Sequence, residues 1–301
     1  MVERFPGDAY RISRLQQNIM VLTSMFLSKT YISFLILFLL TGFSSGAPEQ
    51  ELGYSKALLQ EGFTFKGPAA AFPRQKKYEI SFSATLYSAS LIAIELQGLP
   101  GSNPKASGYY VALWQGTQIE DRYRSQAQQL IQLDSQEGSF VFELSEGINN
   151  KDYIIGLGID DKDSTSFCST VIIPKDQPLY IPVSDTYAFS SSVTLVKIGT
   201  NSLIAAYRTP AFNLPAMNQN WIALFQGPFT ANTFKGRNLI IRQNIPGNIN
   251  EGMAAINNIE GGLMPEQYYT LVYGMGYAST DSNSTYNIIA ATEFQVPGNK
   301  E

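Results

Sequence analysis

Histidine is absent from the 301 residues, and cysteine occurs once, at Cys168. The lack of imidazole excludes Ser-His-Asp and Cys-His nucleophile systems and most catalytic zinc sites. A single cysteine excludes an intrachain disulfide, so each core must be held by packing alone. Because Cys168 lies in an apolar strand pattern, we expect a small core residue rather than a reactive thiol.

Charge is also scarce, since only 15% of the residues are charged and the net charge is -4. Without residues 1–47, 17 basic and 23 acidic residues remain, a net charge of -6. No basic stripe is left to follow a phosphate backbone, which excludes nucleic acid as the partner. Hydrophobic residues make up 44% of the chain, enough for packed cores, and the length suggests two domains.

The N-terminal region contains a short apolar run, residues 31–40, with Lys29 before it and small residues up to Ala47 after it. This arrangement predicts a secretory signal peptide over residues 1–47. The alternative is an uncleaved membrane anchor, because residues 19–43 are long enough to span a bilayer. Both interpretations place the folded part outside the cytosol, secreted or at the cell surface.

Internal repeats indicate a duplication, with offsets of 112 and 111 residues for the first two matches and 116 and 120 residues for the last two. Four matches recur in the same order: 90–93 with 202–205, 110–116 with 221–227, 153–158 with 269–274, and 161–165 with 281–285. We therefore predict two similar units, with residues 48–76 as an N-terminal linker, 77–175 as the first repeat and 185–297 as the second. The proline-rich residues 174–185 between them predict a short, stiff connector.

Each unit has the pattern of β-strands. Residues 78–86 alternate apolar and polar side chains, which is typical of a half-buried strand. About seven such segments per repeat, separated by Gly, Pro, Asn and Asp clusters, predict an all-β protein of two tandem immunoglobulin-like antiparallel β-sandwich domains behind an N-terminal hydrophobic segment. Residues 122–133 and 55–60 are the places where a helical turn fits. Tyr110, Ala112 and Trp114 share one strand face, as do Trp221, Ala223 and Phe225, and we expect both faces to pack in the sandwich cores.

The second repeat resembles the SKICH family and related immunoglobulin-like sandwiches. The residues that carry the resemblance are 221–225 (WIALF) and 268–273 (YYTLVY). This chain has Asn220 where that family has an acidic residue, and Ala223 where it has glycine; the first repeat has Tyr110 in place of the tryptophan. The resemblance implies a non-catalytic interaction or targeting module.

A D-x-(D/N)-S-T loop occurs in both repeats and is the shared polar pattern. Oxygen ligands for a calcium ion are available from Asp161, Asp163 and Ser164 in the first loop and from Asp281, Asn283 and Thr285 in the second. Asp, Asn and Ser also serve as turn residues between strands, so ordinary turn chemistry is the other interpretation. Asn283 begins an N-glycosylation sequon, which applies only in a eukaryotic secretory route.

These patterns predict an exported, non-catalytic binding or assembly protein that presents two similar β-sandwich surfaces, with a protein partner or self-assembly, no resident cofactor and no enzyme activity. Two alternatives stay open. One is a carbohydrate-binding module, with or without calcium, and the other is an accessory subunit held in a membrane complex by an uncleaved N-terminal segment.

Overall fold

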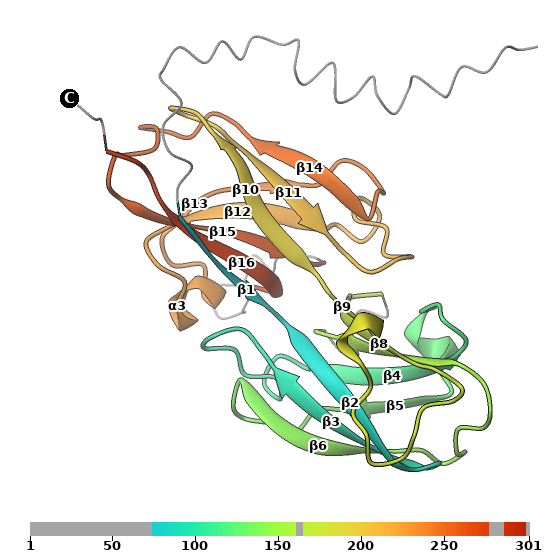
Figure 1. Cartoon of the computed structure of the whole chain (residues 1–301). Helices are drawn as coiled ribbons and strands as arrows, with labels where there is room; N and C mark the ends of the chain where they lie inside the picture. Colours follow the sequence, from blue (N-terminus) through green and yellow to red (C-terminus); the bar gives the residue numbers. More distant parts are fainter. Residues whose placement is uncertain (1–73, 161–164, 277–285, 299–301) are drawn as a thin grey trace, which may run out of the picture. The chain divides into compact units, whose positions relative to one another are not determined.

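The computed structural model describes residues 74–160, 165–276 and 286–298, and within these ranges the chain is almost entirely antiparallel β-structure (Figure 1). The strands form four sheets, which pack as two β-sandwiches. This confirms the predicted fold class. Among the described residues, no helix is long and apolar enough to cross a membrane.

The first sandwich consists of a three-stranded and a five-stranded sheet. The smaller sheet has the order β2-β3-β6, and the larger has the order β5-β4-β7-β8-β9. The strands are β2 (Ser81–Ser88), β3 (Leu91–Gln97), β4 (Tyr110–Gln115), β5 (Ala127–Leu130), β6 (Glu137–Glu143), β7 (Tyr153–Gly158), β8 (Phe167–Ile173) and β9 (Ala188–Ser190).

The second sandwich has the same two kinds of sheet, with the orders β10-β11-β14 and β13-β12-β15-β16-β1. Its strands are β1 (Gln75–Glu79), β10 (Ser192–Ile198), β11 (Leu203–Arg208), β12 (Trp221–Gln226), β13 (Leu239–Asn244), β14 (Glu251–Ile256), β15 (Tyr268–Gly274) and β16 (Ile288–Gln295). A single helical turn, α3 (Ala231–Phe234), follows β12 and begins with a capping box at Thr230.

The chain crosses between the sandwiches twice, and each crossing is a single residue long. β1 pairs with β16 in the second sandwich, and after Ile80 the chain continues as β2 in the first. β9 pairs with β8 in the first sandwich, and after Ser191 it continues as β10 in the second. The strand expected over 78–86 is therefore divided at Ile80. The predicted domain boundaries, 77–175 and 185–297, stay predictions.

The buried apolar side chains of the two sandwiches form one contiguous cluster. Alternation explains the inner faces, since Phe82, Ala84 and Leu86 of β2 are buried while the residues between them are half-buried. Cys168 is fully buried, as the sequence predicts, and burial raises the pKa of its thiol. The thiol donates to the Leu157 carbonyl at 3.5 Å.

The aromatic face of β4 is buried, but on the other side of its sheet from the main core. Val111 and Leu113 belong to the main cluster, whereas Tyr110, Ala112 and Trp114 form a separate cluster with Phe167. Phe167 makes edge-to-face contacts with both rings, with centroid distances of 5.4 and 5.0 Å. The expectation of burial is confirmed, and the expectation that this face fills the space between the sheets is wrong. The residues that follow β4 cover the outer face, because Ile119 joins the same cluster.

Burial fixes the register between the two sandwiches and corrects one sequence match. Leu91 is exposed and Leu203 is buried, so the match of 90–93 with 202–205 is displaced by one residue. By the order of buried residues along β3 and β11, Leu203 corresponds to Ile92, at the same offset of 111 residues that relates Tyr110 to Trp221. A slip of one residue along a strand exchanges its two faces. An alignment by identical residues therefore places exposed positions of one strand opposite buried positions of the other.

Two further segments differ from the sequence expectations. Of the helix considered for residues 122–133, the structure shows one short turn, η1 (Arg122–Arg124), followed by β5. The connector after β8 runs along the outer edge of β2, where Tyr180 N–H donates to Leu86 and Val183 N–H donates to Ala84. It therefore covers part of an edge strand that is otherwise open to pairing. A second short turn, η2 (Asp185–Tyr187), leads into β9.

Candidate interaction surface

All six residues predicted to bind a cation lie outside the described residues. They are Asp161, Asp163, Ser164, Asp281, Asn283 and Thr285, and the predicted glycosylation site at Asn283 lies outside with them. The described ends of the two loops meet, since Asn287 Nδ2 donates to Asp160 Oδ2 at 3.0 Å. Elsewhere in the described ranges, no group of three or more His, Cys, Asp or Glu side chains is placed to hold a metal. The calcium site stays a prediction.

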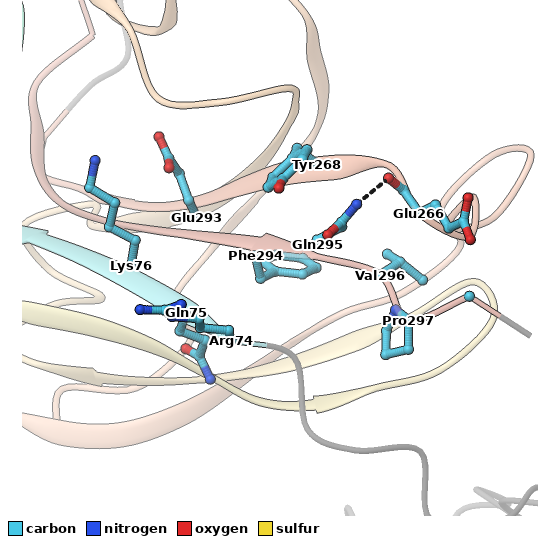
Figure 2. A pocket seen from close by; sticks show the side chains of 11 residues that line it. Arg74, Gln75, Lys76, Glu266, Tyr268, Glu293, Phe294, Gln295, Val296 and Pro297 are labelled. Atoms are coloured by element: carbon cyan, nitrogen blue, oxygen red, sulfur yellow. Dashed lines mark hydrogen bonds between the residues drawn. The ribbon is translucent and has the colours of Figure 1, made fainter. Parts of the chain in front are cut away.

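An open depression of about 760 Å³ lies at the edge where β1 begins beside β16 (Figure 2). Its lining includes the charged residues Arg74, Lys76, Glu266 and Glu293, and Tyr268 lies between the two glutamates. Glu293 already has a structural role, because its Oε1 accepts from the Tyr78 hydroxyl at 2.8 Å and from Phe229 N–H at 2.7 Å. This carboxylate therefore anchors β1 and the loop after β12 to β16.

A different feature stands out at one end of the second sandwich, where the loop between β11 and β12 packs against the loop between β13 and β14. We call residues 209–220 and 245–250 the uncharged loop pair, because neither segment contains Asp, Glu, Lys or Arg. Backbone bonds join the two loops: Thr209 N–H donates to Asn250, Ala216 N–H donates to Gly247, and Ile245 N–H donates to Asn220.

Asparagine side chains hold the uncharged loop pair from the inside. The buried Asn213 accepts at Oδ1 from Asn218 and from Asn220, at 3.0 and 3.3 Å, and donates to Thr209 Oγ1 at 2.9 Å. Asn220, also buried, donates to the Tyr273 hydroxyl at 2.8 Å. Buried amides that are paired in this way rigidify a loop, because breaking any one bond leaves a desolvated partner.

Asn250 adds the link to the neighbouring loop. Its Nδ2 donates to the carbonyls of Pro210 and Asn213, at 2.8 and 2.6 Å. Asn248 Oδ1 accepts from Met217 N–H at 3.0 Å. The side chains of Asn213, Asn220 and Asn250 are therefore bonded inside the loop pair, whereas Asn248 is exposed beside the apolar side chains.

Four large apolar side chains project from the uncharged loop pair into solvent, with exposed fractions between 37% and 69%: Phe212 (54%), Leu214 (37%), Met217 (69%) and Ile249 (54%). Ala211 and Pro246 are exposed beside them. Single exposed apolar residues are ordinary, but several of them on two adjoining loops without charge are typical of an interaction surface.

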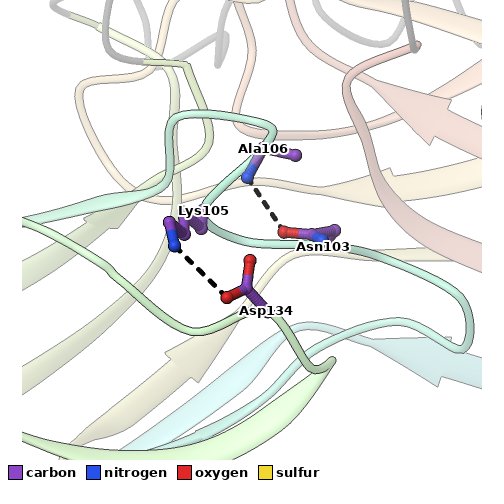
Figure 3. A network of polar contacts seen from close by, with 4 residues as sticks. All are labelled: Asn103, Lys105, Ala106 and Asp134. Carbon is purple, nitrogen blue, oxygen red and sulfur yellow. Dashed lines mark hydrogen bonds and ion pairs between the residues drawn. The ribbon is translucent and has the colours of Figure 1, made fainter.

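The corresponding loops of the first sandwich, residues 98–109 and 131–136, share the backbone but not the side chains. At an offset of 111 residues the same turns recur: Tyr109 N–H donates to Pro104 as Asn220 N–H donates to Pro215. Here Lys105 Nζ lies 3.2 Å from Asp134 Oδ2, and Ala106 N–H donates to Asn103 Oδ1 (Figure 3). The first pair of loops is therefore charged and hydrophilic where the second is apolar.

The apex of the loop shows the difference most clearly. Gly101 has φ of 82° and Phe212, at the corresponding position, has φ of 72°. Glycine adopts this left-handed region freely, whereas a bulky side chain there is strained. A Cβ at Gly101 would lie 2.7 Å from the Cβ of Ala231, so this apex fits closely against α3 of the second sandwich. Phe212 instead keeps more than half of its surface exposed.

Sequence reasoning missed the uncharged loop pair, although a signal for it exists. Residues 209–220 and 243–250 form two runs without a charged residue, and these runs contain Phe, Leu, Met and Ile among turn-forming Asn and Pro. Such loops are expected to be polar. Only the pairing of β12 with β13 shows that the two runs meet.

No family model matches the chain, and no curated protein matches it. Among solved structures, the FN1–FN3 domains of chicken CNTN1 align with 11% identity and a TM-score of 0.23, covering 73% of this chain and 67% of that chain. The BSP domain of a biofilm associated protein aligns with 10% identity and a TM-score of 0.22, covering 75% of this chain and 30% of that chain. Likenesses at these TM-scores carry no functional argument, and the fold rests on the strand pairing itself.

Proposed function

We propose that this protein is an exported, non-catalytic binding protein built from two copies of one eight-strand unit, and that the second copy carries the contact surface. The uncharged loop pair is that surface. Export is supported by the sequence of residues 29–47, and a non-catalytic role by the absence of histidine.

Correspondence of the sheets supports the two copies. The two five-stranded sheets have the same strand order. In the first it is β5-β4-β7-β8-β9, and the corresponding strands of the second are β13-β12-β15-β16-β1. Both sandwiches also place a glycine beneath the first ring of the aromatic face. A Cβ at Gly158 would lie 2.2 Å from the Tyr110 ring, and one at Gly274 would lie 2.1 Å from the Trp221 ring.

The observation that carries the binding function is the exposure of Phe212, Leu214, Met217 and Ile249 on two loops without a charged residue. A loop that only connects strands needs no such side chains, and its counterpart in the first sandwich lacks them. The predicted pair of similar surfaces becomes, in this proposal, one hydrophilic and one apolar surface.

Co-purification of the native chain with its partners tests this function. The double variant Leu214→Ser/Met217→Ser should retain at least tenfold less of the partner that co-purifies with the wild-type chain, because both side chains lie in the contact. The matched control is Asn103→Ser/Ala106→Ser, at the corresponding positions of the first sandwich. Retention of the same material by all three proteins would contradict the proposal.

Two sequence features favour the carbohydrate alternative, the aromatic rings and the acidic loops, and the burial of the rings removes the first. The rings that would form a sugar-stacking platform, Tyr110, Trp114, Trp221 and Phe225, are each at most 4% exposed. The predicted calcium loops are its remaining support, and glycan-array binding with and without a chelator tests them. The accessory-subunit alternative depends on residues 1–47, and mass spectrometry of the mature N-terminus tests that.

A further inference from the structure

We propose that β14 is a docking edge for a second copy of this chain, with the two β14 strands paired antiparallel about a two-fold axis at Met253. This edge belongs to the smaller sheet of the second sandwich (Figure 1), and the inference is independent of the contact proposed for the uncharged loop pair. An unpaired edge strand offers a row of free N–H and C=O groups to another strand, so the argument begins with how the chain closes its edges.

The two three-stranded sheets have four edges, and groups of the chain itself close the first two at β2 and β10. The connector after β8 covers β2 through the N–H groups of Tyr180 and Val183. On β10, the side-chain amide of Gln75 bonds to both backbone groups of Leu195, at 2.9 Å to the carbonyl and 3.1 Å to the N–H. An amide bonded in this way occupies the place of a neighbouring strand.

The remaining two edges, β6 and β14, differ from each other. In the first sandwich, Gln129 Nε2 donates to the Val141 carbonyl at 2.9 Å, and Gln129 Oε1 accepts from Glu143 N–H at 3.3 Å. By its place in the pairing of β13 with β12, Gln243 is the corresponding residue of the second sandwich. Gln243 is exposed, and its side chain makes no hydrogen bond to another described residue. The edge of β14 therefore lacks the amide that closes β6.

The alternation of bonds in an antiparallel ladder determines which backbone groups of β14 are free. Thr209 N–H donates to Asn250, so the even-numbered residues of β14 bond to β11 in the register that follows. The N–H and C=O groups of Met253 and Ala255 therefore point to the open side. Outside the ladder with β11, no hydrogen bond among the described residues reaches them.

Length and charge protect the edge strands of the larger sheets. β5 and β9 have four and three residues, and β1 and β13 carry Lys76, Lys77 and Arg242. Short strands and basic side chains at an edge prevent unwanted pairing. In contrast, β14 has six residues, and its single charged side chain, Glu251, lies 2.9 Å from Arg208. Among the strands that the structure describes, β14 is the edge without a guard.

A second copy fits this edge because β14 is compatible with itself. About a two-fold axis at Met253, the two Met253 side chains lie opposite each other and Glu251 lies opposite the partner's Ala255, so no like charges meet. Met253 is 61% exposed and is flanked by Gly252 and Ala254, so no bulky neighbour holds the two edges apart. Both strands are already formed, and their pairing does not carry the ordering cost of an unstructured peptide.

The paired edges would join two three-stranded sheets into one sheet of six strands. A contact made by one six-residue strand from each copy belongs to the weak interfaces, which bury less than about 1,200 Å² in total. We therefore expect a dimer that dissociates on dilution.

Cross-linking through introduced cysteines tests the inference in the full-length protein. Met253→Cys places two thiols on directly opposed residues, where a Cα separation of about 5.5 Å suits a disulfide. The control is Ser139→Cys, at the corresponding exposed position of β6, whose edge Gln129 closes. Cys168 is buried and does not compete. Because the apolar residues 31–40 also bring chains together, the readout is the difference between the two positions.

With copper phenanthroline as the oxidant, non-reducing gels measure the initial rate of covalent dimer formation. Each rate is divided by the rate at which iodoacetamide labels the same thiol, which corrects for thiol exposure and reactivity. We expect the corrected rate for Met253→Cys to be at least tenfold that for Ser139→Cys.

The register is tested by adding Ala255→Glu or Ala255→Lys to the Met253→Cys protein. In the proposed pairing, the new glutamate faces the partner's Glu251, whereas the new lysine faces an opposite charge. Two such pairs form in each dimer, so the corrected rate should be about threefold or more lower for Ala255→Glu than for Ala255→Lys.

Equal corrected rates at positions 253 and 139 would overturn the pairing of β14 with a second copy. Equal corrected rates for Ala255→Glu and Ala255→Lys would overturn the two-fold axis at Met253. None of these substitutions alters the uncharged loop pair, so either failure leaves the co-purification test of the proposed function unaffected.

Discussion

The two loop pairs, at the same end of their sandwiches, have nearly the same backbone and opposite surfaces. In the first, Lys105 and Asp134 form an ion pair, and the apex residue is Gly101. In the second, the corresponding residues are Ala216, Asn248 and Phe212, and the buried amides of Asn213 and Asn220 replace Ser102 and Tyr109. Turn geometry is therefore set by backbone bonds common to both loop pairs, whereas the chemistry presented to solvent is set by a few side chains.

The prediction with the largest expected effect concerns whether the two sandwiches unfold as one cooperative unit. Phe294→Ala removes a fully buried ring from β16 and should lower the free energy of unfolding by about 3–5 kcal/mol. Because β1 and β9 link the sandwiches and their buried side chains are contiguous, the first sandwich should lose stability as well.

The chain's two tryptophans, Trp114 and Trp221, lie one in each sandwich, so a Trp221→Phe background reports on the first sandwich alone. In that background, denaturant unfolding followed by Trp114 fluorescence should shift to lower denaturant when Phe294→Ala is added. An unmoved Trp114 transition would mean that the sandwiches unfold independently and are to be compared as separate domains.

A smaller effect is expected from the amides inside the uncharged loop pair. Asn213→Ala removes the acceptor of Asn218 and Asn220 in a buried site and should cost about 2–3 kcal/mol. The matched change, Ser102→Ala, removes one hydroxyl and should cost less than about 1 kcal/mol. Chemical denaturation measures both. Equal losses at the two sites would show that the amide network has no special role in the second sandwich.

The smallest effect concerns the ion pair of the first loop pair. Lys105 and Asp134 are both exposed, with side-chain fractions of 48% and 71%. Exposed pairs contribute little, so Lys105→Ala should change the unfolding free energy by less than about 1 kcal/mol, and less still at high salt. Thermal melts at two salt concentrations check this. A loss comparable with that of Asn213→Ala would contradict the expectation that this exposed ion pair contributes little to stability.

The fold class could be predicted because alternation of apolar side chains is a local signal. Residues such as Phe82, Ala84 and Leu86 show it directly, and so does the aromatic strand around Tyr110 and Trp221. The exchange of β1 and β9 could not be predicted, because Ile80 and Ser191 look like ordinary positions within a strand. Which sheet a strand joins depends on long-range pairing, which a local pattern does not contain.

The site was missed for a related reason. Sequence reasoning favoured the repeated acidic loops because carboxylates are conspicuous, and those residues lie outside the described ranges. Met217 and Ile249 are unremarkable in the sequence, since apolar residues are usually buried. Their exposure accompanies the hydrogen bonds of Asn213 and Asn250 inside the loop pair, which join residues up to 40 positions apart.

The pairing of Gln75 with Phe294 has a mechanical consequence. The polypeptide enters and leaves the described fold side by side, at neighbouring ends of the antiparallel strands β1 and β16. Tension applied between these two ends would open their hydrogen bonds one after another, as a zipper opens, and never load them all together. A molecule arranged in this way is therefore poorly suited to transmit a pull between these two ends.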